Sequence, residues 1–187
     1  AGTLATLLNT IPVSTGPGTG VRGSEGAATV FNANAASQSI QVTKLANLGV
    51  AKAFSPTTVP MGGTSTATIT ITNNAAAAVG LSTLTENLPA SLTATTTPTV
   101  TCPGGNPTSA TALGGSFPNL TFPVGATLAA SGSCTVSFVA RAATQADNGY
   151  TGTNTVPANG VGNSRGLNSP VANSSLTVQS PLLTTKS

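Results

Sequence analysis

The ten-residue run Thr64–Asn73 constrains the fold of this chain more than any other feature. Its hydroxyl residues alternate with Ala67, Ile69 and Ile71. Successive side chains of a β-strand point to opposite faces, so this period of two predicts a strand with one buried apolar face and one hydroxyl-rich face. The run Cys134–Ala140 alternates in the same way. The chain is therefore expected to bury the apolar faces of its sheets against one another.

Turn-forming residues divide the rest of the chain into short segments. The 187 residues include 21 Gly and 13 Pro, and no stretch shows the apolar period of a helix. Between residues 48 and 178, the segments bounded by these turns predict about seven to nine short strands. This number and spacing of strands favour an all-β sandwich of two sheets with Greek-key connections.

Two parts of the chain repeat each other. Asn154–Pro157 (Asn-Thr-Val-Pro) matches Asn9–Pro12 (Asn-Thr-Ile-Pro), and Ser175–Val178 matches Ser39–Val42. The offset falls from 145 to 136 residues between these matches, and a longer loop in the first copy explains it at little cost in loop-closure entropy. Repetition at a nearly constant period predicts a tandem array of modules. Chance similarity between threonine-rich segments is the alternative.

The repeat sets the predicted domain boundaries. Residues 1–47 are interpreted as the C-terminal part of a preceding β-sandwich module, or as a donor or linker segment. Residues 48–187 are interpreted as a complete module that runs into the start of the next, because Thr185–Ser187 aligns with Ala51–Ala53. The front half of the first module would lie upstream or be supplied by another chain.

The charged residues point away from catalysis and from nucleic-acid binding. The six basic residues stand singly, and aromatic residues that could stack on bases make up only 3% of the chain. The chain has no histidine, and its three carboxylates, Glu25, Glu86 and Asp147, lie far apart in sequence. We therefore predict no enzyme, no metal site, no cofactor and no nucleic-acid partner.

The two cysteines, Cys102 and Cys134, are predicted to form a disulfide, as in exported proteins. The bridge would close a loop of about 33 residues and stabilise the fold by roughly 3–4 kcal/mol through the entropy of the unfolded chain. Two free buried thiols are the alternative.

The remaining surface chemistry favours an extracellular location. Only 5% of the residues are charged, which suits a secreted polymer better than a cytosolic monomer that relies on charge for solubility. The segment shows no signal peptide and no apolar run long enough to span a bilayer, so we expect any export signal or anchor to lie outside it.

Lys52 and Glu86 form a candidate site for a covalent crosslink. Some surface adhesin domains join a lysine on a first strand to an asparagine near the end of the domain, next to a carboxyl group that carries protons. The lysine must be desolvated into its neutral form for this chemistry. Lys52 lies in the first predicted strand of the complete module and Glu86 in its middle. A surface lysine and a loop glutamate are the alternative.

Five motifs follow one another along the complete module. They are Lys52–Pro56, Met61–Thr66 leading to Thr70–Asn73, Glu86–Leu92, Gly132–Val136 and Asn154–Pro157. Together they resemble the bacterial conserved-repeat surface domains of the "domain of unknown function 11" type. The resemblance implies an Ig-like sandwich that occurs in tandem in large secreted or wall-associated proteins, with structural or adhesive roles and no catalytic residues.

These observations predict a structural repeat or subunit of an extracellular bacterial surface filament, sheath or stalk. Its partners would be neighbouring copies of the same module, joined by strand sharing, because an incomplete sandwich exposes unpaired strand edges. The alternative is an adhesin module that engages a host or glycan ligand through the loops at 16–26, 104–109 and 159–168. Acidic or aromatic residues clustered in one loop would favour that alternative, and the sequence has no such cluster.

Overall fold

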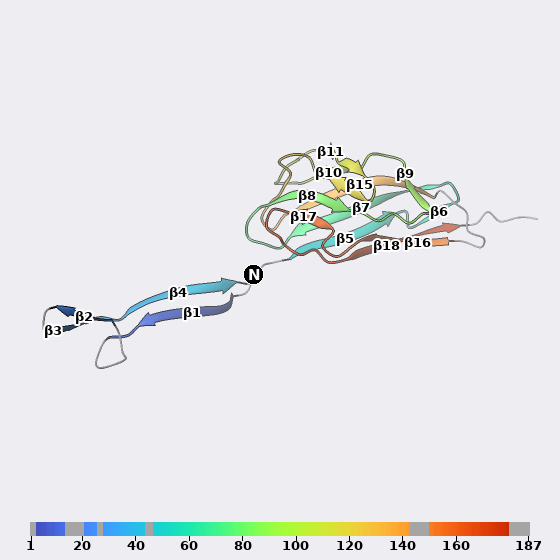
Figure 1. Ribbon diagram of the computed structural model, residues 1–187. Coiled ribbons are helices and arrows are strands. Elements are labelled where there is room, and N and C mark those ends of the chain that lie inside the picture. Colours follow the sequence, from blue (N-terminus) through green and yellow to red (C-terminus); the bar gives the residue numbers. More distant parts are fainter. Residues whose placement is uncertain (1–2, 14–20, 26–27, 44–46, 143–149, 180–187) are drawn as a thin grey trace, which may run out of the picture. The chain divides into compact units, whose positions relative to one another are not determined.

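The structure is a computed structural model that describes residues 3–13, 21–25, 28–43, 47–142 and 150–179 (Figure 1). The chain divides into two compact units, Ala1–Lys44 and Leu45–Ser187. Within the described ranges, every regular element is a strand. The sequence match predicted at Thr185–Ser187 lies outside the described residues.

In the first unit, the residues that the structure describes form two antiparallel strand pairs. The strands are β1 (Thr3–Ile11), β2 (Arg22–Glu25), β3 (Ala28–Phe31) and β4 (Ala36–Thr43). In the longer pair, β1 and β4, Asn9 faces Gln38 and Ile11 faces Ala36. In the second pair, β2 and β3, the strand β2 lies within the loop predicted at 16–26. The short strands of this pair were missed because neither shows a clear alternation.

The described residues of the second unit form fourteen strands, β5 to β18. Their bounds are β5 (Leu48–Ser55), β6 (Thr58–Pro60), β7 (Thr64–Asn73), β8 (Val79–Thr85), β9 (Leu92–Ala94), β10 (Thr99–Thr101), β11 (Thr111–Ala112), β12 (Gly114–Ser116), β13 (Asn119–Thr121), β14 (Thr127–Leu128), β15 (Ser133–Ala142), β16 (Tyr150–Val156), β17 (Val161–Asn163) and β18 (Ala172–Gln179).

These strands form a sandwich of two layers. One layer has the order β11-β10-β15-β7-β5, and β9 pairs with β15 beyond the end of β10. The other layer contains β12-β13-β8-β14 with β17 on β8, together with β16-β18-β6. A bridge between Asn87 and Thr155 connects its two parts. The predicted all-β, Ig-like two-sheet sandwich with Greek-key connections is confirmed.

The number of strands exceeds the predicted seven to nine because turns interrupt the longer extended segments. β9 and β10 both pair with β15, and β13 and β14 both pair with β8, so each couple acts as one broken strand. β17 (Val161–Asn163) lies in a segment that was predicted to be a loop. Its Val-Gly-Asn sequence has the composition of a turn, and its pairing with β8 makes it a strand.

The core forms where the alternating runs predicted it. Ala67, Ile69 and Ile71 on β7 have no exposed surface, and Val136 and Phe138 on β15 are buried beside them. Burial of each large apolar side chain stabilises the fold by about 1.5–3 kcal/mol. The alternation predicted from the sequence is therefore confirmed, and its apolar residues form the inner face of the central sheet.

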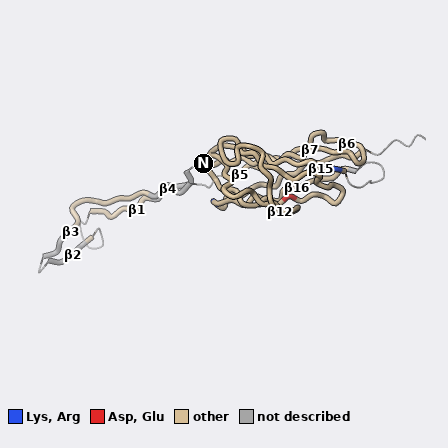
Figure 2. The backbone as a smooth tube through the Cα atoms, turned by 90° about the horizontal axis from the view of Figure 1, so that it is seen from above, with Lys and Arg blue, Asp and Glu red and all other residues tan. Residues whose placement is uncertain are grey.

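Hydroxyl groups, rather than charges, cover the outer faces. Thr151 pairs with Thr177 at 3.3 Å and Thr153 with Ser175 at 3.1 Å across β16 and β18. Figure 2 shows how few charged positions lie along the described backbone. Among the described residues of the second unit, the exposed charged side chains are those of Arg141 and Arg165.

Cys102 and Cys134 form a disulfide, as predicted. Both residues are fully buried. Cys102 directly follows β10 and Cys134 lies in β15, which pairs with β10, so the bond joins neighbouring strands of the same layer.

The buried side chain of Asn73 holds two turns together. Its Nδ2 donates hydrogen bonds to the carbonyl oxygens of Ala77 at 2.8 Å and Ala129 at 2.9 Å, and its Oδ1 accepts one from the Ala75 N–H at 2.9 Å. Asn73 itself has no exposed surface. The turn after β7 and the turn before β15 therefore share one amide.

Replacing Asn73 by alanine is expected to lower the free energy of unfolding by about 2–3 kcal/mol, because buried main-chain groups would lose their partners. Urea unfolding followed by circular dichroism measures this loss. Asn74 is the matched control, because its amide is exposed and donates a hydrogen bond to the carbonyl oxygen of Asn47 at 2.9 Å. Asn74→Ala is expected to cost less than about 0.5 kcal/mol. Equal losses in the two variants would contradict the role assigned to Asn73.

Candidate crosslinking site

Lys52 lies in a row of apolar residues on β5. Leu48 and Phe54, at alternate positions of the same strand, are 1% and 3% exposed. The side chain of Lys52 is fully buried, and what exposure the residue has belongs to its main chain. The alternation that buries Leu48 and Phe54 thus carries a lysine into the core.

Glu86 follows β8 directly and is buried as completely as Lys52. Its N–H donates a hydrogen bond to the carbonyl oxygen of Pro118 at 2.8 Å, which ties the end of β8 to the turn before β13. Its Oε1 accepts a hydrogen bond from Nζ of Lys52, and both side chains have no exposed surface. The lysine is therefore not at the surface, and the glutamate, although it follows the end of β8, has a buried side chain.

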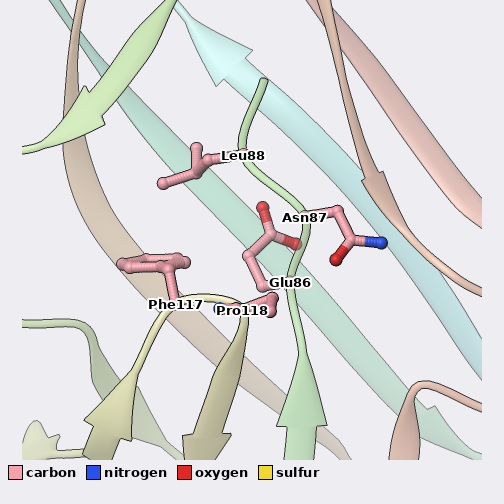
Figure 3. A pocket seen from close by; sticks show the side chains of 5 residues that line it. All are labelled: Glu86, Asn87, Leu88, Phe117 and Pro118. Carbon is pink, nitrogen blue, oxygen red and sulfur yellow. The ribbon is translucent and has the colours of Figure 1, made fainter. Parts of the chain in front are cut away.

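Glu86 is also one of the residues that line a hollow of about 250 Å³. Leu88, Phe117 and Pro118 supply apolar walls of this hollow. Figure 3 shows the Glu86 carboxyl group on the same side of its strand as Leu88, whereas Asn87 points to the other side.

Asn154 on β16 is the third buried polar residue at this place. Main-chain hydrogen bonds between Asn87 and Thr155, of 2.9 and 3.3 Å, align the segment after β8 with β16. Side chains alternate along both segments, so Glu86 and Asn154 lie on the same face of this pairing. Asn154 has no exposed surface, and neither its Nδ2 nor its Oδ1 has a hydrogen-bond partner among the described residues.

Aromatic rings keep this place apolar. Nζ of Lys52 lies 5.9 Å from the ring centroid of Phe138, and the ring of Phe138 meets that of Phe117 edge to face at 5.0 Å. Contact with an aromatic face favours a cation, but it cannot replace the hydration that burial removes.

Burial moves the pKa values of Lys52 and Glu86 toward each other. Loss of hydration lowers the pKa of the Lys52 amine, although the charge and the hydrogen bond of Glu86 act in the opposite direction. Loss of hydration raises the pKa of the Glu86 carboxyl group, which the charge and hydrogen bond of Lys52 and the nearby Asn154 amide oppose. Both shifts favour the neutral forms, an amine with a free lone pair beside a protonated carboxyl group.

The structure thus brings together the two residues that the sequence singled out, Lys52 and Glu86. The sequence analysis expected an asparagine near the end of the module without identifying it as Asn154. One signal could have pointed to Asn154. It alternates with Gly152 and Val156, and all three residues are buried.

The sequence holds two other carboxylates besides Glu86. Glu25 lies in β2 of the first unit, and Asp147 lies outside the described residues. Within the described ranges, no three residues of the types His, Cys, Asp and Glu gather to hold a metal ion. In the same ranges, no helix has the length and apolar character needed to cross a membrane.

A family model described as Domain of unknown function (DUF7933) matches residues 49–178. This is not the "domain of unknown function 11" type that the sequence motifs resemble, so that specific type is not confirmed, and the family model supports only a domain of unknown function. No curated protein matches the chain.

Two solved structures are similar to the chain at low identity. A non-cellulosomal cohesin from the hyperthermophilic archaeon Archaeoglobus fulgidus is 15% identical over 71% of this chain and 91% of that one, with a TM-score of 0.40. The collagen adhesin (CNA) from S. aureus is 6% identical over 80% of this chain and 56% of that one, with a TM-score of 0.33. At these values, neither protein indicates what this chain binds or does.

Proposed function

The chain belongs to the family described as Domain of unknown function (DUF7933), and we propose that it is a structural repeat of an extracellular bacterial filament, sheath or stalk. Its β-sandwich modules follow one another in tandem, and its partners are neighbouring copies of the same module. Residues 1–47 are the closing part of one module, and residues 48–187 form the next and run into its successor.

The observation that carries this proposal is that two strand pairs have the same register. They are β1 with β4, called the first hairpin below, and β16 with β18. In the first unit, Asn9 faces Gln38 and Ile11 faces Ala36. In the second unit, Asn154 faces Ser174 and Val156 faces Ala172, which are the counterparts of those four residues in the sequence repeat. Chance similarity between threonine-rich segments would not be expected to reproduce the strand pairing as well.

The face of the first hairpin that would be covered in a complete module is open. Ile11 is 42% exposed and Asn9 is also exposed, whereas their counterparts Val156 and Asn154 have no exposed surface. A hollow of about 260 Å³ lies at Asn9 and Ile11. Strands equivalent to the rest of the second unit, from a second copy of the module, would cover this face and pair its edges.

The surface and the disulfide support an extracellular location. Disulfides persist in oxidising compartments, and the bond between Cys102 and Cys134 is formed in the structure. An outer face of hydroxyl groups with few charges suits a module whose surface is largely covered by its neighbours.

A chimeric chain tests the proposal. Asn9 and Asn154 are 145 positions apart, so Ala1 is the counterpart of Ala146. A second copy of residues 45–145, fused to the amino end of Ala1, is expected to complete the first module. Hydrogen exchange is the measurement: amides of β1 and β4 should become as protected as those of β16 and β18.

Two substitutions in the chimera provide the control. Ile11→Asp places a charge on the covered face and is expected to abolish the new protection. Leu8→Asp changes the opposite face, whose counterpart Thr153 is on the outer side, and is expected to leave the protection intact. A first hairpin that stays unprotected in the unmodified chimera would argue against tandem modules.

Electron microscopy of the native material separates a filament from an adhesin. Regular fibres with an axial repeat close to one module length are expected. Isolated monomers, or a flexible stalk that binds a ligand only at its tip, would favour the adhesin alternative.

A further inference from the structure

We propose that Lys52 and Asn154 are joined in the folded protein by an isopeptide bond that forms without another enzyme, with Glu86 as the group that carries the proton. The bond connects β5 in one layer of the sandwich with β16 in the other. The proposed bond lies entirely within the second unit, so its test does not depend on whether the modules form a tandem array.

The unpaired atoms of the cluster are the first argument. Among the described residues, four buried side-chain nitrogen or oxygen atoms lack a hydrogen-bond partner, and three of them are Glu86 Oε2, Asn154 Nδ2 and Asn154 Oδ1. A cluster built only as an ion pair would be expected to surround both carboxylate oxygens with donors. Here Oε1 meets Lys52 and Oε2 meets no donor, beside an amide that also has no partner.

Formation of the bond removes these unpaired groups. Nδ2 of Asn154 leaves the protein as ammonia, so it needs no acceptor. The carbonyl oxygen of Asn154 remains and can accept a hydrogen bond from Oε2 of a protonated Glu86. The polar atoms that lack hydrogen-bond partners before the reaction are thus either removed or hydrogen-bonded in the crosslinked product.

The reaction balances within the three side chains. The lone pair of the neutral Lys52 amine attacks Cγ of Asn154, and the Nζ–Cγ bond forms while protonated Glu86 stabilises the charge that develops on Oδ1. Glu86 carries a proton from Nζ to Nδ2, the Cγ–Nδ2 bond breaks, and one ammonia molecule departs. The hollow beside Glu86 provides room for the departing ammonia. Glu86 ends in the state in which it began, and no oxidant, metal or cofactor takes part.

The surroundings favour this reaction over hydrolysis of the amide. All three side chains are buried, which keeps water from Cγ of Asn154. Burial also favours the neutral amine, the only form of lysine that has a lone pair for the attack.

The intact mass of the full-length oxidised chain tests the proposal. It is expected to lie about 17 Da below the mass calculated from the sequence and the disulfide, the loss of one ammonia. After reduction, trypsin should release Leu45–Arg141 linked to Ala142–Arg165, with no cleavage after Lys52. The variants Lys52→Ala, Asn154→Ala and Glu86→Gln are each expected to show the full mass. The other lysine variants, Lys44→Ala and Lys186→Ala, should keep the deficit.

Two results would overturn the proposal. One is a wild-type chain that carries the disulfide and shows the full mass. The other is a 17 Da deficit confined to an unlinked peptide, because succinimide formation at Asn148-Gly149 or Asn159-Gly160 also releases ammonia. A crosslink that persists in Glu86→Gln would remove Glu86 from the reaction and contradict the role assigned to it. The wild-type mass decides the question even if a variant fails to fold.

Discussion

Replacing Glu86 by alanine is expected to lower the free energy of unfolding by about 3–5 kcal/mol, because Lys52 would remain in the core without its partner. The comparison uses chains that also carry Asn154→Ala, in which no bond to Lys52 can form. Urea unfolding of the two chains then reports the loss of the Lys52–Glu86 contact separately from any crosslink. Deprotonation of Lys52 to its neutral form limits this loss of unfolding free energy, so the size of the loss depends on pH.

The expected pH dependence follows from the lowered pKa of Lys52. In the unfolded chain, Lys52 keeps its proton up to a pH near its ordinary pKa of 10.5. In the folded chain, burial lowers that pKa, so the unfolded state binds more protons in the interval between the two values. Stability therefore rises with pH in this interval. Without the charge and the hydrogen bond of Glu86, which raise the pKa of Lys52, that pKa falls further. The variant thus gains more stability than the chain with Glu86, and the loss caused by Glu86→Ala should shrink as the pH rises from neutral toward the ordinary pKa of lysine.

An apolar pair provides the control for this prediction. Lys52→Met combined with Glu86→Leu leaves no charge in the core, and such replacements of buried ion pairs are often neutral or stabilising. The double variant is expected to recover most of the stability that Glu86→Ala loses, and to lose its pH dependence. A double variant as unstable as Glu86→Ala at every pH would show that shape, rather than the unpaired lysine, causes the loss.

Removal of the disulfide is the second change with a large expected effect. Cys102 and Cys134 are separated by 32 positions, so the bond closes a substantial loop in the unfolded chain. The double variant Cys102→Ala/Cys134→Ala is expected to lose about 3–4 kcal/mol of unfolding free energy, mainly because its unfolded chain is freer. Urea unfolding in the Asn154→Ala chain measures this loss.

The reduced protein separates loop closure from packing. Chemical reduction opens the loop and keeps both sulfur atoms in place, whereas the alanine variant also removes their contacts in the core. Both are expected to lose most of the same stability, with the alanine variant somewhat less stable because both cysteines are fully buried. A reduced protein as stable as the oxidised one would rule out loop closure as the source of the effect.

The sequence predicted most reliably what depends on neighbouring residues. The alternation of Ala67, Ile69 and Ile71 with hydroxyl residues defined both the strand and its buried face, because the side-chain period of a strand is a local property. Turn residues predicted the division into short strands for the same reason. β17 was missed because its strand state comes from pairing with β8, far away in sequence.

The candidate site shows where local information ends. Lys52 and Glu86 were singled out from the sequence by their residue types and by their places along the module. Their complete burial, and the choice of Asn154 among the asparagines, were decided by the tertiary structure. The inner face of β5 carries Lys52 into the core, and the bridge between Asn87 and Thr155 brings Glu86 and Asn154 to one face. These contacts join segments that are remote in sequence, so local propensity and periodicity could not supply them.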